Sequence, residues 1–142
     1  MATILAHVTV KPGKERQWEQ TARSLYEGTH ANETAVRRYE YWRGAEPRTY
    51  YVLLSFEDYR GFLAHQSAEH HEDEVGPIGD AVESMWLEWV DPLSEASPLV
   101  PTEMQHPGRD AGELAATYAV SHPAEVQDWW QALRGDADPG NS

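Results

Sequence analysis

The chain contains no cysteine among its 142 residues. Disulfide bonds, thiolate zinc sites and cysteine nucleophiles are therefore excluded. Basic residues are also scarce, with 11 Lys and Arg against 24 Asp and Glu, so the formal net charge is −13. Such a chain repels polyanions unless its basic residues form one dense patch. The one basic cluster, at 37–48, alternates with aromatic residues as a strand does, so we expect no nucleic-acid partner.

Long apolar runs are missing as well. No run approaches the roughly 18 residues of a membrane-spanning helix. The first lysines follow the first apolar stretch, which is the reverse of the order in a signal peptide. We therefore expect a cytoplasmic protein without membrane contact. The 40% of hydrophobic residues, with six Trp and seven Tyr, suffice for one domain with a core.

Hydrophobic periodicity in the first half of the chain predicts a strand, a helix and a hairpin. Residues 2–10 alternate as a strand with two occupied faces does. An apolar stripe over 18–29 predicts a helix that frays near Gly28. Residues 36–43 and 49–57 are rich in β-branched and aromatic residues and enclose a short turn, which predicts an antiparallel hairpin.

The next segment predicts short helices and a last strand. Asp58 is a suitable N-cap for one helix, and a second helical segment opens near Ser67. Gly76-Pro77 must kink or restart that segment. Residues 84–90 form the last predicted strand, which Asp91-Pro92 ends. The order strand, helix, strand, strand, helix, strand is the split βαβ arrangement of a ferredoxin-like α+β fold.

Three segments of this pattern resemble the antibiotic biosynthesis monooxygenase family: HVTVKPGKERQWEQ, LLSFEDYRGFLAHQSAEHH and MWLEWVDPL. The resemblance covers about residues 2 to 93, so we treat 1–93 as the domain. The most specific part of the resemblance is one motif. In it, a strand is followed by Glu-Asp, then by a helix with Ala-His, and, three or four residues later, by a further His. The resemblance implies a ferredoxin-like protomer whose sheet pairs with that of a second copy. The homodimer would be a dimeric α+β barrel, with a ligand pocket between sheet and helices in each protomer.

The resemblance also implies a chemistry. Members of the family include cofactor-free oxygenases of anthrones and quinols, heme-degrading oxygenases, and proteins without known activity. The heme-degrading branch places its iron-binding histidine where this chain has Val75, so we expect no heme. We expect a cofactor-independent monooxygenase that uses O2 and an electron-rich, polyketide-type aromatic, without metal. A redox-neutral cyclase or isomerase and a non-catalytic binding protein are the alternatives.

Three histidines are candidates for the catalytic base, because imidazole exchanges protons near neutral pH. His7 stands where oxygenases of the family often place Asn, and His65 matches the family motif. His71 stands where members carry an inward apolar residue. Each also has a structural interpretation, as a hydrogen-bonded core or interface residue or as a partner of helix-end carbonyls.

Four further residues are candidates for substrate binding on the pocket wall. They are Phe56, Trp86, Tyr39 and His70. The run EHHEDE at 69–74 also permits a metal site built on His65, His70, His71 and Glu74. A solvated helix face is the simpler interpretation of that run.

Residues 94–142 are predicted to be a linker followed by a C-terminal strand-helix extension. Leu114, Tyr118 and Val120 suggest a short strand, and the helix after it carries Trp129 and Trp130. Two adjacent indoles are costly to expose, so we expect residues 113–134 to dock on the domain with Trp129 buried.

Overall fold

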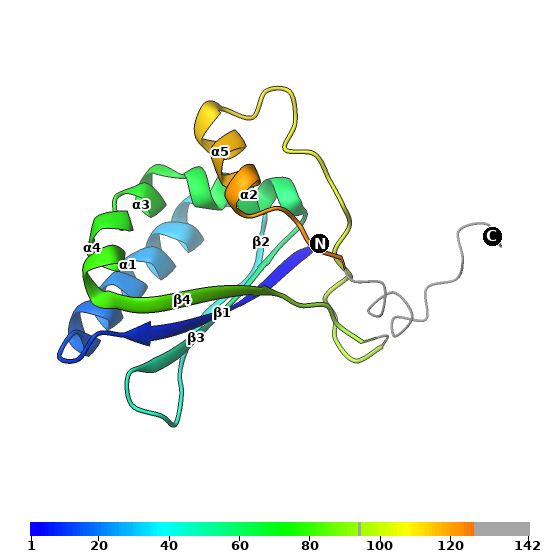
Figure 1. The fold of residues 1–142 in the computed structure, drawn as a ribbon. Coiled ribbons are helices and arrows are strands. Elements are labelled where there is room, and N and C mark those ends of the chain that lie inside the picture. Colours follow the sequence, from blue (N-terminus) through cyan, green and yellow to red (C-terminus); the bar gives the residue numbers. More distant parts are fainter. Residues whose placement is uncertain (94, 127–142) are drawn as a thin grey trace.

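One four-stranded antiparallel sheet, in the order β2-β3-β1-β4, supports the whole structure. The computed structural model describes residues 1–93 and 95–126. The strands are β1 (Ala2–Val10), β2 (Val36–Arg43), β3 (Thr49–Phe56) and β4 (Val82–Trp89). The helices are α1 (Glu15–Asn32), α2 (Tyr59–Ser67), α3 (Glu69–Glu72), α4 (Val75–Ala81) and α5 (Glu113–Ser121). In this described part, every helix lies on the same side of the sheet (Figure 1). The predicted ferredoxin-like α+β fold is confirmed.

The central strand β1 defines the two faces of the sheet. Ile4, Ala6 and Val8 face the helices and are at most 2% exposed. His7 belongs to the opposite set, because successive side chains of a strand alternate between faces. Antiparallel pairing with β3 and β4 on either side fixes this register. No helix among the described residues has the length and apolarity that a membrane crossing requires.

Helix α1 buries the predicted stripe except for Tyr26, which is 45% exposed, and it does not fray at Gly28. It continues to Asn32, and the N–H of Glu33 donates to the Thr29 carbonyl at 2.9 Å. Gly28 instead allows His70 to lie close to the α1 backbone, because a Cβ at this position would lie 3.1 Å from the Cβ of His70. Gly28 therefore lets α3 pack closely against α1 rather than ending the helix.

The short helices follow the predicted signals in part. Asp58 caps α2 by accepting a hydrogen bond from the Gly61 N–H at 2.8 Å, as predicted. Ser67 does not cap the next helix, since its hydroxyl donates to the Leu63 carbonyl at 2.8 Å. Pro77 lies in the first turn of α4, where its missing N–H costs no helical hydrogen bond.

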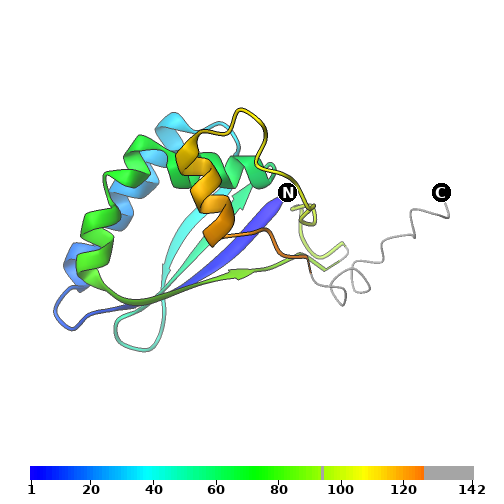
Figure 2. The same cartoon turned by 45° about the horizontal axis from the view of Figure 1, so that its top comes forward.

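The predicted strand at 114–120 is wrong, because this segment forms helix α5. Alanine, the strongest helix former, supplies three of its nine residues. Ala115, Tyr118 and Ala119 pack against the core at helical spacing. Helix α5 lies beside α2 (Figure 2), and the Tyr59 hydroxyl donates to the His122 carbonyl at 2.6 Å. The described part of the extension thus packs on the domain through α5, while the predicted burial of Trp129, like Trp130, lies outside the described residues.

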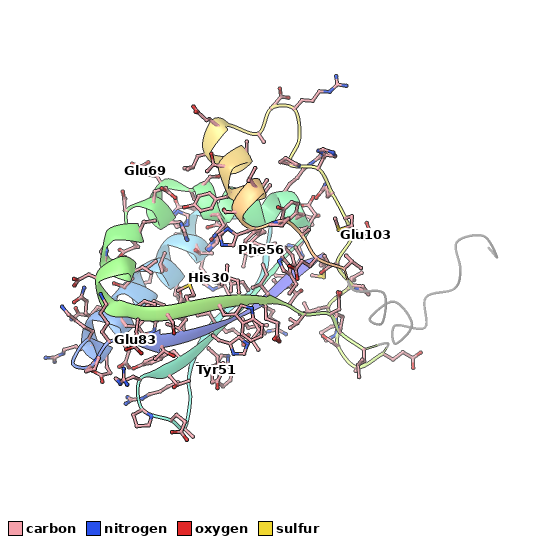
Figure 3. All side chains as sticks on the ribbon, in the orientation of Figure 1. His30, Tyr51, Phe56, Glu69, Glu83 and Glu103 are labelled. Atoms are coloured by element: carbon pink, nitrogen blue, oxygen red, sulfur yellow. The ribbon has the colours of Figure 1, made fainter. Side chains whose placement is uncertain are left out.

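The face of the sheet that points away from the helices carries a row of rings across all four strands. Trp42 pairs with Tyr51, Tyr51 with His7, and His7 with Trp86. Figure 3 shows Tyr51 on this side and Phe56 between sheet and helices. Trp42 and Trp86 are 60% and 58% exposed. Within the described part of the chain, nothing covers this row.

Candidate functional site

A cavity of about 270 Å³ lies between the helix-facing side of the sheet and the helices. Strand residues such as Ile4, Ala6 and Leu54 form its floor, and Ile78 lines it from α4. Six polar side chains interrupt this apolar wall. They are Tyr39, Tyr41, His65, Gln66, His71 and His122. An apolar cavity with a few convergent polar groups is the usual form of a small-molecule site.

Two tyrosines supply hydroxyl groups at the wall of the cavity. The Tyr39 and Tyr41 hydroxyl oxygens lie 2.7 Å apart and share a hydrogen bond. Burial raises the pKa of both phenols well above the ordinary value, and the neighbouring phenol contributes at Tyr41. Both therefore remain neutral at physiological pH. One hydroxyl proton makes their mutual hydrogen bond, and the other is free to be donated to a further oxygen atom.

His71 and Trp18 each line the cavity and each have a buried ring nitrogen without a hydrogen-bond partner in the described residues. The His71 Nδ1 lies 3.7 Å from a Glu72 oxygen, too far for a hydrogen bond. Burial lowers the pKa of His71 to about 4, assisted by the charge of His65. His71 is therefore a neutral imidazole at pH 7, with one nitrogen that accepts and one that donates. The Trp18 Nε1 can only donate.

Behind this wall, Glu33 joins two histidines from different helices. Its Oε2 lies 2.9 Å from the His65 Nδ1 and 2.6 Å from the His70 Nε2. Burial raises the pKa of the Glu33 carboxyl, but the hydrogen bonds and charges of the two histidines outweigh burial, so the net shift is downward. His65 is 1% exposed and also lines the cavity, with its ring centroid 5.2 Å from that of His71.

The structure brings some predicted site residues together and separates others. Tyr39, His65 and His71 meet at the cavity. Phe56 packs behind His65 in the core, at 5.2 Å between ring centroids, rather than on the cavity wall. His70 turns toward Glu33 and lines a separate surface hollow.

The expected positions of His7 and Trp86 on the pocket wall are wrong. Both rings lie on the opposite face of the sheet, stacked at 4.6 Å between centroids. Strand alternation is the reason, because Ala6 on β1 and Leu87 on β4 occupy the cavity side. His7 therefore does not share the cavity with His71.

Several residues of the site were not predicted from the sequence. Glu33 gave no local signal, because His65 and His70 lie 32 and 37 residues further along the chain. Tyr41 could have been found, because strand alternation places it on the same face as Tyr39. The cavity position of His122 depends on α5, which was predicted as a strand.

Comparisons with known proteins agree with this architecture. Residues 1–75 match the model of a family described as antibiotic biosynthesis monooxygenase. Among solved structures, the fold is similar to that of a candidate antibiotic biosynthesis monooxygenase from Caulobacter crescentus. The TM-score is 0.62 and the identity 20%, over 66% of this chain and 90% of that one.

Two further solved structures share the fold. One is a candidate antibiotic biosynthesis monooxygenase from Nitrosomonas europaea, with a TM-score of 0.61 and 17% identity over 66% of this chain and 99% of that one. The other is a protein of Pseudomonas aeruginosa, with a TM-score of 0.61 and 18% identity over 66% of this chain and 94% of that one. No curated protein matches the chain in sequence.

The raised pKa values of the tyrosine pair predict a delayed ionisation. The unfolded chain should lose its phenol protons near the ordinary pKa of about 10, whereas folded Tyr39 and Tyr41 should keep theirs, so stability should fall as the pH rises above this value. Tyrosinate absorbance should therefore show fewer ionised phenols in the native protein than in urea. The double variant Tyr39→Phe, Tyr41→Phe should reduce this deficit, and an unchanged deficit would contradict the assignment.

Proposed function

Because the chain belongs to the antibiotic biosynthesis monooxygenase family, we propose that it catalyses the cofactor-independent monooxygenation of a small, electron-rich aromatic of the polyketide phenol or anthrone type. One observation supports this class of substrate most directly. The same apolar cavity is lined by two residues whose buried ring nitrogens lack partners within the described chain, His71 through Nδ1 and Trp18 through Nε1. We assign the His71 Nδ1 as an acceptor, while the Trp18 Nε1 can only donate. A flat ligand with a hydroxyl and a carbonyl group would complement both.

The size of the cavity limits the ligand. A volume of about 270 Å³ is near the lower end of ligand pockets, which span roughly 300–1,000 Å³. The apolar floor formed by Ile4, Ala6 and Leu54 favours a planar hydrocarbon framework over a charged or sugar-like substrate. A small aromatic with few polar groups therefore fits the wall better than a nucleotide or a peptide.

In the proposed reaction, His71 accepts a proton from the bound substrate, and the hydroxyl proton of the Tyr39–Tyr41 pair that is not used in their mutual hydrogen bond is donated to the developing oxyanion. The anion would itself stabilise the protonated imidazole, because an opposite charge nearby raises the pKa of a histidine. A bound substrate would displace water from the apolar wall, which would strengthen these interactions.

The electrons for the reaction come from the substrate. For an anthrone, the enolate passes electrons to O2, and a CH2 group becomes a C=O group. One oxygen atom enters the product, and the other leaves as water together with the two hydrogens of the CH2 group. No external reductant is required, so the reaction balances as one substrate and one O2 giving one quinone and one water.

Replacement of His71 tests this function. In an oxygen-electrode screen of hydroxyanthrones and quinols, we expect wild-type protein to consume one O2 for each substrate oxidised. His71→Ala should lower turnover by about 10²–10⁴-fold, the usual contribution of a general base. His106→Ala, which removes an exposed imidazole, is the matched control and should keep wild-type turnover.

Other results of the screen would favour the alternatives. Conversion of the substrate without O2 uptake would indicate a redox-neutral cyclase or isomerase. Saturable binding without any conversion would indicate a binding protein. Wild-type turnover in a folded His71→Ala variant would refute the role of His71.

We also propose that the protein works as a homodimer in which the uncovered faces of two sheets pack together. The family match supports an oligomer. The ring row of Trp42, Tyr51, His7 and Trp86 supports this location, because two indoles that are 60% and 58% exposed are unusual on an isolated protomer. The cavity lies on the other face of the sheet, so a dimer of this kind leaves its wall intact.

Light scattering tests the dimer directly. Wild-type protein at micromolar concentration should have twice the protomer mass of 16.1 kDa, and Trp86→Glu should reduce the mass to that of the protomer. The matched control is Val120→Glu, which places the same charge at an 84% exposed apolar residue of α5 and should leave the dimer intact. A protomer mass for the wild type, or a dimeric Trp86→Glu variant, would contradict the proposal.

A further inference from the structure

Glu33, His65 and His70 converge from three different elements on the side of the wall away from the cavity. One nitrogen of each imidazole and one carboxylate oxygen lie within 4.8 Å of one another. Glu33 is the residue that ends α1, His65 belongs to α2, and His70 belongs to α3. The Thr29 hydroxyl lies 3.5 Å from the His65 Nδ1 and 3.4 Å from the His70 Nε2, between the same two rings.

The donor set has the composition of a metal site. Two imidazoles and one carboxylate are the protein ligands of many catalytic zinc centres, where a water molecule takes the fourth position. Zinc–ligand bonds of about 2.0–2.2 Å in tetrahedral geometry separate neighbouring ligand atoms by roughly 3.3–3.5 Å. The observed separations, from 2.6 Å for Glu33 Oε2 to His70 Nε2 up to at most 4.8 Å, bracket that spacing.

The cluster is held in place by its surroundings. His65 is enclosed by Phe56 and Tyr39, with ring centroids at 5.2 and 5.0 Å. His70 reaches Glu33 because Gly28 has no side chain, since a Cβ there would lie 3.1 Å from the Cβ and Cγ of His70. Each imidazole is therefore positioned by packing as well as by the hydrogen bond to Glu33, which is a requirement for a preorganised ligand set.

An ion can reach the cluster from solvent. A surface hollow of about 550 Å³ opens beside α2 and α3 and is lined by Glu33 and His70. Glu69 and Asp73 also line it, so the hollow carries negative potential that attracts cations. The side chains of Glu33 and His70 are 11% and 19% exposed, whereas His65 is enclosed behind them.

From this geometry we infer that Glu33, His65 and His70 bind a divalent transition-metal ion of the zinc type. Imidazole nitrogens suit Zn²⁺, Ni²⁺ and Co²⁺, while Mg²⁺ prefers oxygen ligands and near-octahedral geometry. Without metal, N–H groups of the two imidazoles donate to the carboxylate, and these protons occupy the place of the ion. Metal binding displaces them, because only a deprotonated ring nitrogen is a ligand.

This inference is independent of the proposed oxygenase function, because the ion would lie outside the cavity and its binding can be measured without substrate. It has one consequence for the cavity. Coordination at the Nδ1 of His65 leaves the remaining ring proton on Nε2. The metal would thus fix the tautomer of a residue that also lines the cavity.

Zinc titration of the chelator-treated, full-length protein tests the site. Calorimetry should give one Zn²⁺ per protomer, and Zn²⁺ in excess should raise Tm by about 5 °C or more. Mg²⁺ at the same concentration should have no effect. Co²⁺ should give visible absorption bands characteristic of nitrogen and oxygen ligands in a low-coordinate site.

Variants locate the binding. Glu33→Gln and His70→Ala should each weaken Zn²⁺ affinity by about 100-fold or more, and Gly28→Ala by about tenfold through displacement of His70. Glu27→Gln and His30→Ala remove an exposed carboxylate and an exposed imidazole of α1 and should bind as the wild type does. His65 is left unchanged because it is fully enclosed.

Two results would overturn the inference. Absence of stoichiometric Zn²⁺ binding would show that the cluster is a hydrogen-bonded structural element. Equal affinity in the wild type, Glu33→Gln and His70→Ala would show that Zn²⁺ binds elsewhere on the acidic surface.

Discussion

Side chains along a β-strand alternate between two faces, and β1 is the strand on which this constraint has the widest consequences. Its even-numbered residues Ile4, Ala6 and Val8 lie under the helices, and His7 lies on the uncovered face. The described helices all cover one face (Figure 1), and the small-molecule cavity lies between them and the sheet. The other face keeps an exposed row of rings, which suits assembly rather than chemistry. The proposed catalysis therefore belongs to the face that the helices cover, and the proposed dimerisation to the uncovered face.

Beneath the helices, the cost of burying polar atoms organises the site. A buried donor or acceptor without a partner costs about 1–3 kcal/mol. Tyr39 and Tyr41 satisfy one another, and Glu33 is satisfied by two imidazoles. The ring nitrogens of His71 and Trp18 are left unpaired among the described residues. A complementary ligand would recover this cost, which is why the cavity, rather than the larger surface hollow, is the better candidate for the substrate.

Most of the fold follows from periodicity in the sequence, and part of the site does not. The strands, the α1 stripe and the Asp58 cap are local signals, because each depends on residues within a few positions of one another. Helix α5 was missed because a short apolar run fits either a strand or a helix until its packing partner is known. Glu33 was missed because its role depends on residues more than 30 positions away. The face on which His7 lies could be predicted from alternation, but the family resemblance had suggested the pocket instead.

We propose that the cavity holds a hydroxylated aromatic ketone through His71 and Trp18. A crystal structure of the protein with a bound hydroxyanthrone, prepared without O2, measures this directly. We expect electron density for the ligand between sheet and helices, with its hydroxyl oxygen within about 3.2 Å of the His71 Nδ1 and its carbonyl oxygen equally near the Trp18 Nε1. A cavity that stays closed to ligand at saturating concentration, or a ligand bound on the ring row instead, would contradict it.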